Sequence, residues 1–247
     1  SIGDDAFAYC ENLINISIPN SVTSIGKRAF AYCENLDNIT IPDKVTVIEE
    51  ETFYNCSMLT NITLPEGIIS IGDRAFENSG DYLESIILPN SITFIGQNTF
   101  AYCGISEINI PTSMTFISEG TFENSRLAKI IIPNGITSIE KRAFANCDLN
   151  EITIPASVTS IGEEAFYRCG SLRRVTILNG VTSIGEGAFS YSFVCEIDIP
   201  ASVTFISDNA FERCEFNKEG FIVSKGSYAE NYARQKLKLP EYMIFVK

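Results

Sequence analysis

The feature that most constrains the fold of this chain is a repeat with a period of 22 to 24 residues. One phenylalanine recurs at that interval through most of the sequence, at Phe7, Phe30, Phe53, Phe76, Phe100, Phe122, Phe144, Phe166, Phe189 and Phe211. A proline keeps the same interval, and Leu178 occupies its slot in one repeat. A single repeat of this length cannot bury its own apolar side chains. The periodicity therefore predicts a solenoid whose coils stack into a continuous core.

Each repeat combines an alternating segment, a corner and the recurring phenylalanine, as the repeat that contains Phe53 illustrates. Ile39 and Ile41 alternate with polar residues, which predicts a short strand with one buried face. Pro42 has no N–H group to donate, so it is expected to end that strand and turn the chain. The β-branched segment that ends at Ile48 predicts a second short strand. The segment around Phe53 is expected to be a short helical or 3₁₀ piece. The predicted core includes Phe30, Phe53, Phe76, Phe100, Ile39, Ile62, Ile86 and Ile108.

The repeats extend over residues 1–216, which we expect to form about nine coils plus a partial first one. After Cys214 the interval fails, and residues 217–247 are expected to form a C-terminal α/β cap. Within this cap the sequence predicts a strand over 221–223, a helix over 227–238 and a final strand over 242–246. No comparable segment precedes Ser1, so we expect the chain to be an N-terminally truncated part of a longer protein.

The repeat has the pattern Leu-x-x-Ile-x-Ile-Pro-x-x-Val-x-x-Ile-Gly-x-x-Ala-Phe-x-x-Cys, read over residues 13–33 and again over 36–56. It resembles the BspA-type leucine-rich repeats of bacterial and protozoan surface proteins over about residues 1–216. The segment 226–233 is similar to the one that closes such arrays. The resemblance implies a leucine-rich-repeat solenoid, a right-handed superhelix of mostly short parallel β-strands with short helical or 3₁₀ turns. It also implies a cell-surface or secreted protein involved in adhesion, with no enzymatic site.

Charge and composition exclude several classes of function. Eighteen basic and 31 acidic residues give a formal net charge of −13, which opposes binding to nucleic acid or anionic lipid. The chain has no histidine, which removes the commonest general base and the commonest metal ligand. Its apolar runs are far shorter than the roughly 18 residues that a membrane span requires. We therefore predict no catalytic residues, no cofactor, no metal site and no membrane span.

Seven of the eight cysteines occupy one slot, three residues after the repeat phenylalanine, at Cys10, Cys33, Cys56, Cys103, Cys147, Cys169 and Cys214. Three other coils carry Ser79, Ser125 and Ser192 in this slot, an exchange that a zinc site would not tolerate. We predict small, semi-buried side chains that are mainly reduced and free of metal, and whether any of them pair as disulfides stays open. Cys195 lies outside the slot and is expected to be the most exposed thiol.

The outward positions of the first strands vary from coil to coil, as a binding surface would. Four residues before the corner, neutral side chains give way along the chain to Glu107, Lys129, Glu151 and Arg174. Two residues before the corner, Ile87 and Ile131 interrupt a column of mainly Ser, Thr and Asn. We predict that these six residues contribute to a partner-binding surface. The alternative is that the isoleucines are ordinary exposed apolar residues and the charges a solvated face.

Two further candidates lie on the second strands. The slot that holds serine in several coils becomes Phe94 and Phe116 in two consecutive coils, and Phe205 later. Serine elsewhere indicates a partly exposed slot, so the two rings are expected to form an apolar patch for a partner. The alternative is that the rings tuck against the corner and fill local space.

The sequence thus predicts a non-enzymatic module that binds a protein or glycan partner, which would belong to a host or another cell surface. The alternative function is a structural stalk or spacer that presents another domain. The two differ in whether the isolated chain captures a ligand. The identity of the ligand and the oligomeric state stay open.

Overall fold

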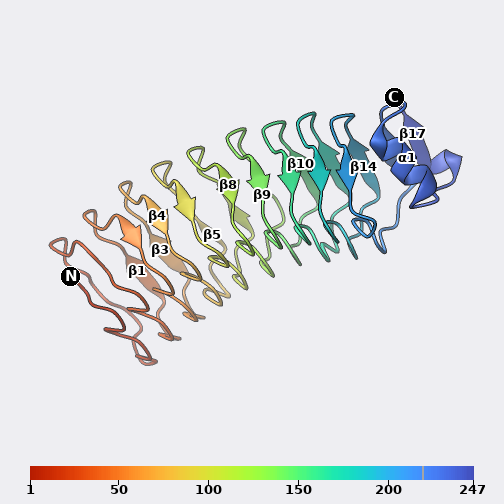
Figure 1. The fold of residues 1–247 in the computed structure, drawn as a ribbon. Helices are drawn as coiled ribbons and strands as arrows, with labels where there is room; N and C mark the ends of the chain where they lie inside the picture. The colour runs from red at the N-terminus through yellow and green to blue at the C-terminus, as the bar shows by residue number, and fades with distance from the viewer. Residues whose placement is uncertain (219) are drawn as a thin grey trace. The chain divides into compact units, whose positions relative to one another are not determined.

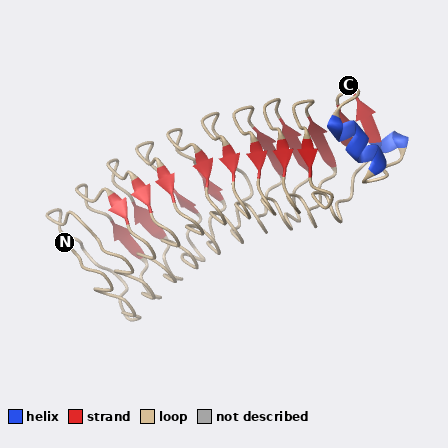
Figure 2. Ribbon diagram, viewed as in Figure 1, coloured by secondary structure: helices blue, strands red, loops and turns tan. Residues whose placement is uncertain are grey.

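The computed structural model describes residues 1–218 and 220–247. It is a parallel β-solenoid of about nine turns with very little helix, which confirms the predicted fold class. Short strands of successive coils lie side by side, and turns and loops make up most of the remaining chain (Figures 1 and 2). The chain divides into two compact units, Ser1–Met114 with Ser118–Ile130, and Thr115–Ile117 with Ile131–Lys247.

In the first unit the coils from Asn38 onward contribute strands to two kinds of parallel sheet, one before the proline corner and one after it. The strands before the proline corner form the pairs β1 (Asn38–Thr40) with β3 (Asn61–Thr63), and β5 (Ser85–Ile86) with β7 (Glu107–Ile108). The strands after the corner form a three-stranded sheet of β2 (Val47–Ile48), β4 (Ser70–Ile71) and β6 (Phe94–Ile95). Equivalent residues of successive coils pair, since Ile39 lies opposite Ile62 and Ile71 lies opposite Ile95.

The second unit repeats this plan in two five-stranded parallel sheets. The strands before the corner, with two strands from the C-terminal region, lie in the order β10 (Glu151–Ile154), β12 (Arg174–Ile177), β14 (Glu196–Ile199), β16 (Phe221–Val223) and β17 (Ile244–Val246). The strands after the corner lie in the order β15 (Phe205–Ile206), β13 (Ser183–Ile184), β11 (Ser160–Ile161), β9 (Ser138–Ile139) and β8 (Phe116–Ile117).

The repeat phenylalanines form the centre of each core. In the first unit Phe30 and Phe53 stack at 5.5 Å between ring centroids, and their planes differ by 5°. In the second unit Phe166 and Phe189 stack at 5.2 Å. Because the coils pair in register, these rings meet the same ring of the next coil, and all four are fully buried. All eight residues named above as the predicted core are buried, which confirms that prediction.

The segment around each phenylalanine differs from the short helical or 3₁₀ piece that was expected. It is a series of turns. Successive backbone N–H groups donate alternately to a carbonyl of the same coil and to a carbonyl of the next coil. The N–H of Ala31 donates to Arg28 within its coil, whereas the N–H of Phe30 donates to Thr52 of the following coil. A 3₁₀ helix would direct every N–H within its own coil. Left-handed residues interrupt any helix here, for example Arg28 with φ 56° and Tyr32 with φ 60°.

The C-terminal region contains β16, the helix α1 (Tyr228–Gln235), the 3₁₀ turn η1 (Glu241–Met243) and β17. Ser227 caps α1, since its hydroxyl accepts a hydrogen bond from the N–H of Glu230 at 3.1 Å. The buried ring of Tyr232 lies edge-on to Phe211, 6.2 Å between centroids, so α1 covers the last repeat phenylalanine of this unit. The division into a solenoid over 1–216 and a cap over 217–247 stays a prediction. No helix in the described ranges is long and apolar enough to cross a bilayer.

Candidate binding surface

The strands before the proline corner present a constant inner face and a variable outer face. In the second unit, Ile152 pairs with Val175 and Val175 with Ile197, and these three inward residues are buried and β-branched. The outward residue before each of them changes from Glu151 to Arg174 to Glu196. Packing fixes the inner positions, because any change of volume there disturbs two neighbouring coils. The outer positions are free of this packing constraint, so their residue types can vary to fit a binding partner.

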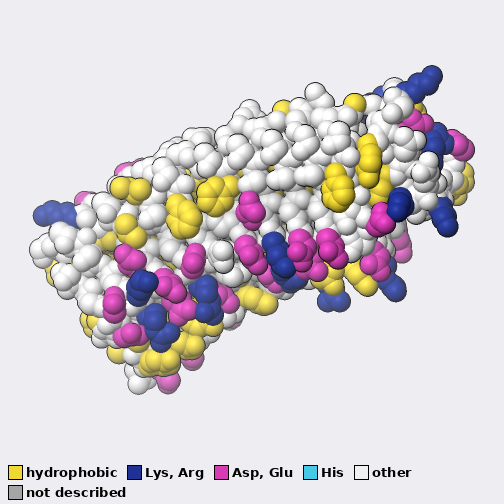
Figure 3. Space-filling model, viewed as in Figure 1, with side chains coloured by type: hydrophobic (Ala, Val, Ile, Leu, Met, Phe, Trp, Pro, Cys, Tyr) yellow, Lys and Arg dark blue, Asp and Glu magenta, His cyan; other side chains and the backbone are white. Residues whose placement is uncertain are grey.

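The four charged candidates lie on this outer face. In the first unit Glu107 of β7 is exposed and forms a parallel bridge with the exposed Lys129. In the second unit Glu151 and Arg174 are exposed and lie opposite each other on β10 and β12. Figure 3 shows acidic and basic side chains intermixed on the face in view, with hydrophobic side chains in small separate groups. The charges of this column therefore alternate within each unit rather than having one sign.

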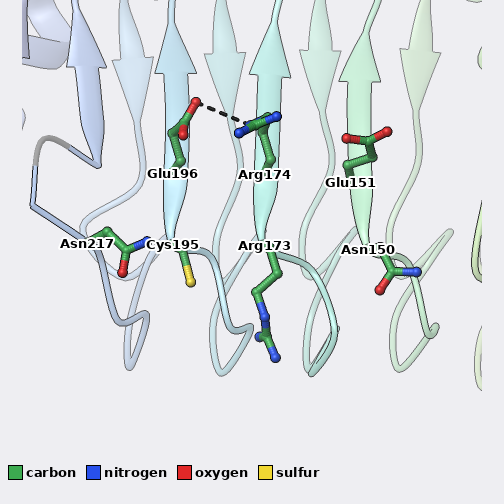
Figure 4. Close-up of a pocket in the computed structure, with 7 residues that line it drawn as sticks. All are labelled: Asn150, Glu151, Arg173, Arg174, Cys195, Glu196 and Asn217. Carbon is green, nitrogen blue, oxygen red and sulfur yellow. Dashed lines mark ion pairs between the residues drawn. The ribbon is translucent and has the colours of Figure 1, made fainter.

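A hollow of about 380 Å³ adjoins this column in the second unit (Figure 4). Its lining consists of Asn150, Glu151, Arg173, Arg174, Cys195, Glu196 and Asn217. Arg174 Nε lies 3.3 Å from Glu196 Oε1, and Figure 4 shows these two side chains turned toward each other. Arg173 extends away from them, with its guanidinium carbon 4.3 Å from the centre of the Phe193 ring. The hollow offers two cations, two carboxylates and two amides, which suits a polar ligand that bears both signs of charge.

The exposed isoleucines lie next to the charged column. Ile87 follows β5 in the first unit and is 82% exposed. Ile131 belongs to the second unit and is 75% exposed. Exposed side chains of this size at positions that hold threonine in other coils add apolar area to a polar face. Their exposure agrees with the orientation that the alternation predicted, and their contact with a partner stays a prediction.

The phenylalanines of the second strands occupy the slot that the sequence assigned to them. Phe94 lies opposite Ser70 in the first unit and is 41% exposed. Phe116 lies opposite Ser138 in the second unit and is half-buried. Phe205, at the edge of the same sheet as Phe116, is 54% exposed. The slot is thus partly exposed in both units, and a joint apolar patch of Phe94 and Phe116 stays a prediction.

The cysteine slot is a buried column of thiols. All eight cysteines are thiols rather than disulfides, and five of the seven in the slot are buried. Burial raises the pKa of the Cys33 thiol to about 11 and that of Cys103 to about 12, because an apolar site disfavours the thiolate. These thiols are therefore protonated and unreactive at neutral pH.

The prediction that Cys195 is the most exposed thiol is wrong. Cys195 is half-buried, because its backbone bonds to both neighbouring coils: its N–H donates to Arg173 at 3.0 Å, and its carbonyl accepts from Asn217 at 2.8 Å. Cys10 is the exposed cysteine. In the described ranges, no three Cys, Asp or Glu side chains come together as a metal site.

One column of polar and aromatic side chains was missed from the sequence. It lies two residues after the repeat phenylalanine, and we call it the turn-edge column: Tyr9, Tyr32, Asn55, Asn78, Tyr102, Asn124, Asn146, Arg168, Tyr191 and Arg213. All ten residues have a left-handed backbone, with φ between 54° and 61°. Asparagine tolerates this conformation, whereas bulkier residues adopt it at a cost. Reading this slot along the repeats, with attention to where asparagine is replaced, would have revealed the column.

The turn-edge column brings aromatic rings and guanidinium groups together. In the first unit Tyr9 and Tyr32 stack at 4.6 Å between centroids. In the second unit Tyr191 lies between two arginines, with the guanidinium carbon of Arg168 at 5.8 Å and that of Arg213 at 5.5 Å from its ring centre. Arginine over an aromatic face is a favourable contact that also fixes the plane of the guanidinium group.

Comparison with known proteins agrees with this architecture. A family model described as "BspA type Leucine rich repeat region" matches residues 1–106 and 93–218, in six copies. A leucine-rich repeat protein from Bacteroides ovatus, 23% identical, covers 100% of this chain and 87% of its own length with a TM-score of 0.60. A leucine rich cell surface protein from Faecalibacterium prausnitzii, 26% identical, covers 90% of this chain and 70% of its own length with a TM-score of 0.56. No curated protein sequence matches significantly.

Proposed function

Because this chain belongs to the BspA-type leucine-rich repeat family, we propose that it is a non-enzymatic binding module that recognises a protein or glycan partner in adhesion. The family consists of repeat proteins that are generally non-enzymatic. The observation that carries the proposal is the contrast between the two sides of the first strands. Inward residues repeat from coil to coil, whereas the outward residues at the same register change their charge. A scaffold of this kind offers a regular surface that sequence variation can adapt to a ligand.

The contact surface that we propose lies on the outward positions of the first strands. Glu107 and Lys129 supply it in the first unit, and Glu151 and Arg174 in the second. Ile87 and Ile131 add apolar area, which is where binding energy concentrates when a partner excludes water. Phe94 and Phe116 on the second strands form an additional candidate contact.

We place the module at the cell surface or in the secreted fraction. The relative from Faecalibacterium prausnitzii is described as a cell surface protein, and its fold extends over 90% of this chain.

The alternative is a stalk that holds another domain away from the cell. A regular parallel solenoid serves this purpose without any ligand of its own, so the two functions differ in one measurable property. A binding module captures a partner as an isolated chain, whereas a stalk does not.

The experiment is a binding screen of the whole 247-residue chain against immobilised extracellular matrix proteins and a glycan array. A hit is then measured with Ile87→Thr and Ile131→Thr, which restore the residue of other coils, and with Arg174→Gln. Loss of binding by these variants at an unchanged melting temperature supports the proposed surface. Absence of any captured protein or glycan favours the stalk. A hit that all three variants retain would place the contact elsewhere.

A further inference from the structure

The turn edge of the second unit carries two arginines that form no ion pair among the described residues. Arg168 and Arg213 are both exposed, and in residues 1–218 and 220–247 neither guanidinium group has an Asp or Glu within ion-pair distance. Successive coils place them in one column, because the N–H of Arg168 donates to Ser190 and the N–H of Tyr191 donates to Glu212. In a chain of net charge −13, these two arginines on one edge are cations that can attract a negatively charged partner.

A different slot of the first unit, two residues before the repeat phenylalanine, shows how arginines in the turns of this chain are otherwise paired. There Arg28 Nε lies 2.8 Å from Asp5 Oδ1, and its Nη1 lies 3.0 Å from Glu51 Oε2. Arg74 is paired as well, with Nε 2.6 Å from Glu77 Oε2. The guanidinium groups of Arg28 and Arg74 therefore donate to carboxylates of the same unit. Within residues 1–218 and 220–247 the donors of Arg168 and Arg213 have no such carboxylate, so they can bind another molecule.

Tyrosine rings hold the unpaired arginines in place. The guanidinium carbon of Arg168 lies 5.3 Å from the centre of Tyr167 and 5.8 Å from that of Tyr191. Arg213 lies 5.5 Å from the centre of Tyr191 on the adjacent coil. The two rings meet edge-on at 5.6 Å. A guanidinium group restrained by aromatic contacts loses less entropy when it binds, while the N–H groups at its edges stay free to donate.

The backbone at these positions gives an independent reason to look for a role. Arg168, Tyr191 and Arg213 have φ of 54°, 59° and 59°, in the region that asparagine tolerates and larger residues disfavour. Four other coils carry asparagine in this slot, so the fold itself does not require arginine or tyrosine there. Residues retained in a disfavoured conformation are concentrated at functional sites.

We infer that Arg168 and Arg213 bind two carboxylates of an extended acidic segment of a protein partner, with Tyr191 between them. The inference deepens the proposed binding function and rests on it. The two arginines are two coils apart, which corresponds to roughly 10 Å at a strand spacing of about 4.8 Å. In a polyproline II segment three residues rise about 9 Å and complete one turn, so acidic side chains at positions i and i+3 lie on one face at a separation that matches the arginines. Each guanidinium group forms a bidentate pair with its carboxylate.

Charge favours an acidic peptide over an acidic polysaccharide. A polysaccharide with an acid on every repeat would extend its charge beyond the two arginines and over the carboxylates of this chain. Those carboxylates repel it over about 8 Å at physiological salt. A peptide with two acidic residues in a neutral context places its charge at the arginines alone.

The test uses the whole chain and a fluorescein-labelled Gly/Ser peptide that carries two glutamates separated by two residues. Its comparison peptides carry glutamine at both positions, or two adjacent glutamates. Anisotropy is measured at about 50 mM and about 150 mM salt. We expect the spaced glutamate peptide to bind at least about tenfold more tightly than either comparison peptide, and less tightly at higher salt.

The matched variants assign the effect to the two arginines. Arg168→Gln with Arg213→Gln should weaken binding at least about tenfold. Arg168→Lys with Arg213→Lys keeps the charge without the planar fork and should restore binding only in part. Lys44→Gln with Lys225→Gln changes net charge equally, away from the column, and should alter the dissociation constant less than about twofold. Melting curves establish that each variant is folded.

Three results would overturn the inference: equal binding of the glutamine peptide, unchanged binding by the folded Arg168→Gln, Arg213→Gln variant, or tighter binding of a hyaluronan oligosaccharide than of the glutamate peptide. The proposed function would survive these results if the binding screen finds a partner and the variants Ile87→Thr, Ile131→Thr or Arg174→Gln lose binding to it. If the screen itself yields no partner, the proposed function fails first.

Discussion

The thiol of Cys56 donates a hydrogen bond to the carbonyl oxygen of Phe30, 3.2 Å away and one coil earlier. Cys33 and Cys103 make the same contact with Phe7 and Phe76, at 3.1 Å and 2.8 Å. Where serine replaces cysteine, the hydroxyl donates to the equivalent carbonyl, as Ser192 does to Phe166. The slot therefore selects a small side chain with one hydrogen-bond donor, which explains why cysteine and serine exchange along the column.

Cys103→Ser should be tolerated better than Cys103→Ala. Serine keeps the donor to the Phe76 carbonyl, whereas alanine removes it and leaves space in a buried site. We expect the alanine variant to lose about 1 to 2 kcal/mol of unfolding free energy and the serine variant less. Urea denaturation of both variants measures the difference. A larger loss for serine than for alanine would contradict the donor role.

The thiol column should make stability fall at alkaline pH. Burial raises the pKa of Cys103 from 9.0 to about 12, so the folded state keeps a proton that the unfolded state loses. The stability from this group is fully present below about pH 9 and is lost as pH rises from 9 towards 12. Urea denaturation across this range should show a steeper decline for the native sequence than for Cys103→Ser, because serine does not titrate. Parallel curves for the two proteins would contradict this prediction.

Thiol accessibility should follow burial. We expect Ellman's reagent at neutral pH to react first with Cys10, which is exposed, and then with Cys195 and Cys214, which are half-buried. The buried thiols should react only after denaturation, when all eight should titrate. Mass spectrometry of the labelled peptides identifies the sites. Rapid native labelling of Cys56 would contradict the packing described above.

Phe100→Ala should be strongly destabilising. The ring is fully buried and stacks between Phe76 at 5.5 Å and Phe122 at 5.9 Å, so its removal leaves a cavity against both neighbours. We expect a loss of about 3 to 5 kcal/mol in a reversible melt. Phe94→Ser, at a partly exposed site of the same unit, is the matched control and should lose much less.

Phe94→Ser combined with Phe116→Ser should separate binding from packing. Both changes restore the residue that other coils carry in this slot. We expect a nearly unchanged melting temperature together with weaker ligand capture or self-association. A large fall in melting temperature would instead show that the rings fill space in the fold, which is the alternative raised by the sequence.

Most of the fold follows from the sequence alone. The recurrence of Phe30, Phe53 and their counterparts predicts stacking because a coil can bury these rings only against the next coil. The alternation around Ile39 predicts which side chains point inward, since successive residues of a strand face opposite sides. The candidate residues could be chosen as departures from the repeat, and the orientation of Ile87 and Phe94 toward solvent could be anticipated in the same way.

The tertiary structure alone decided how the coils satisfy one another's polar groups. Periodicity shows that Cys56 recurs, but the carbonyl that it meets depends on the path of the turn and on the spacing of the coils. The same holds for Arg168, whose contact with Tyr191 joins two coils, and for the left-handed residues that replace the expected helix. A periodic pattern reports which positions are buried, because burial repeats with the backbone. It does not report hydrogen-bond partners or ion pairs, because these depend on distances between side chains of different coils, which only the folded chain defines.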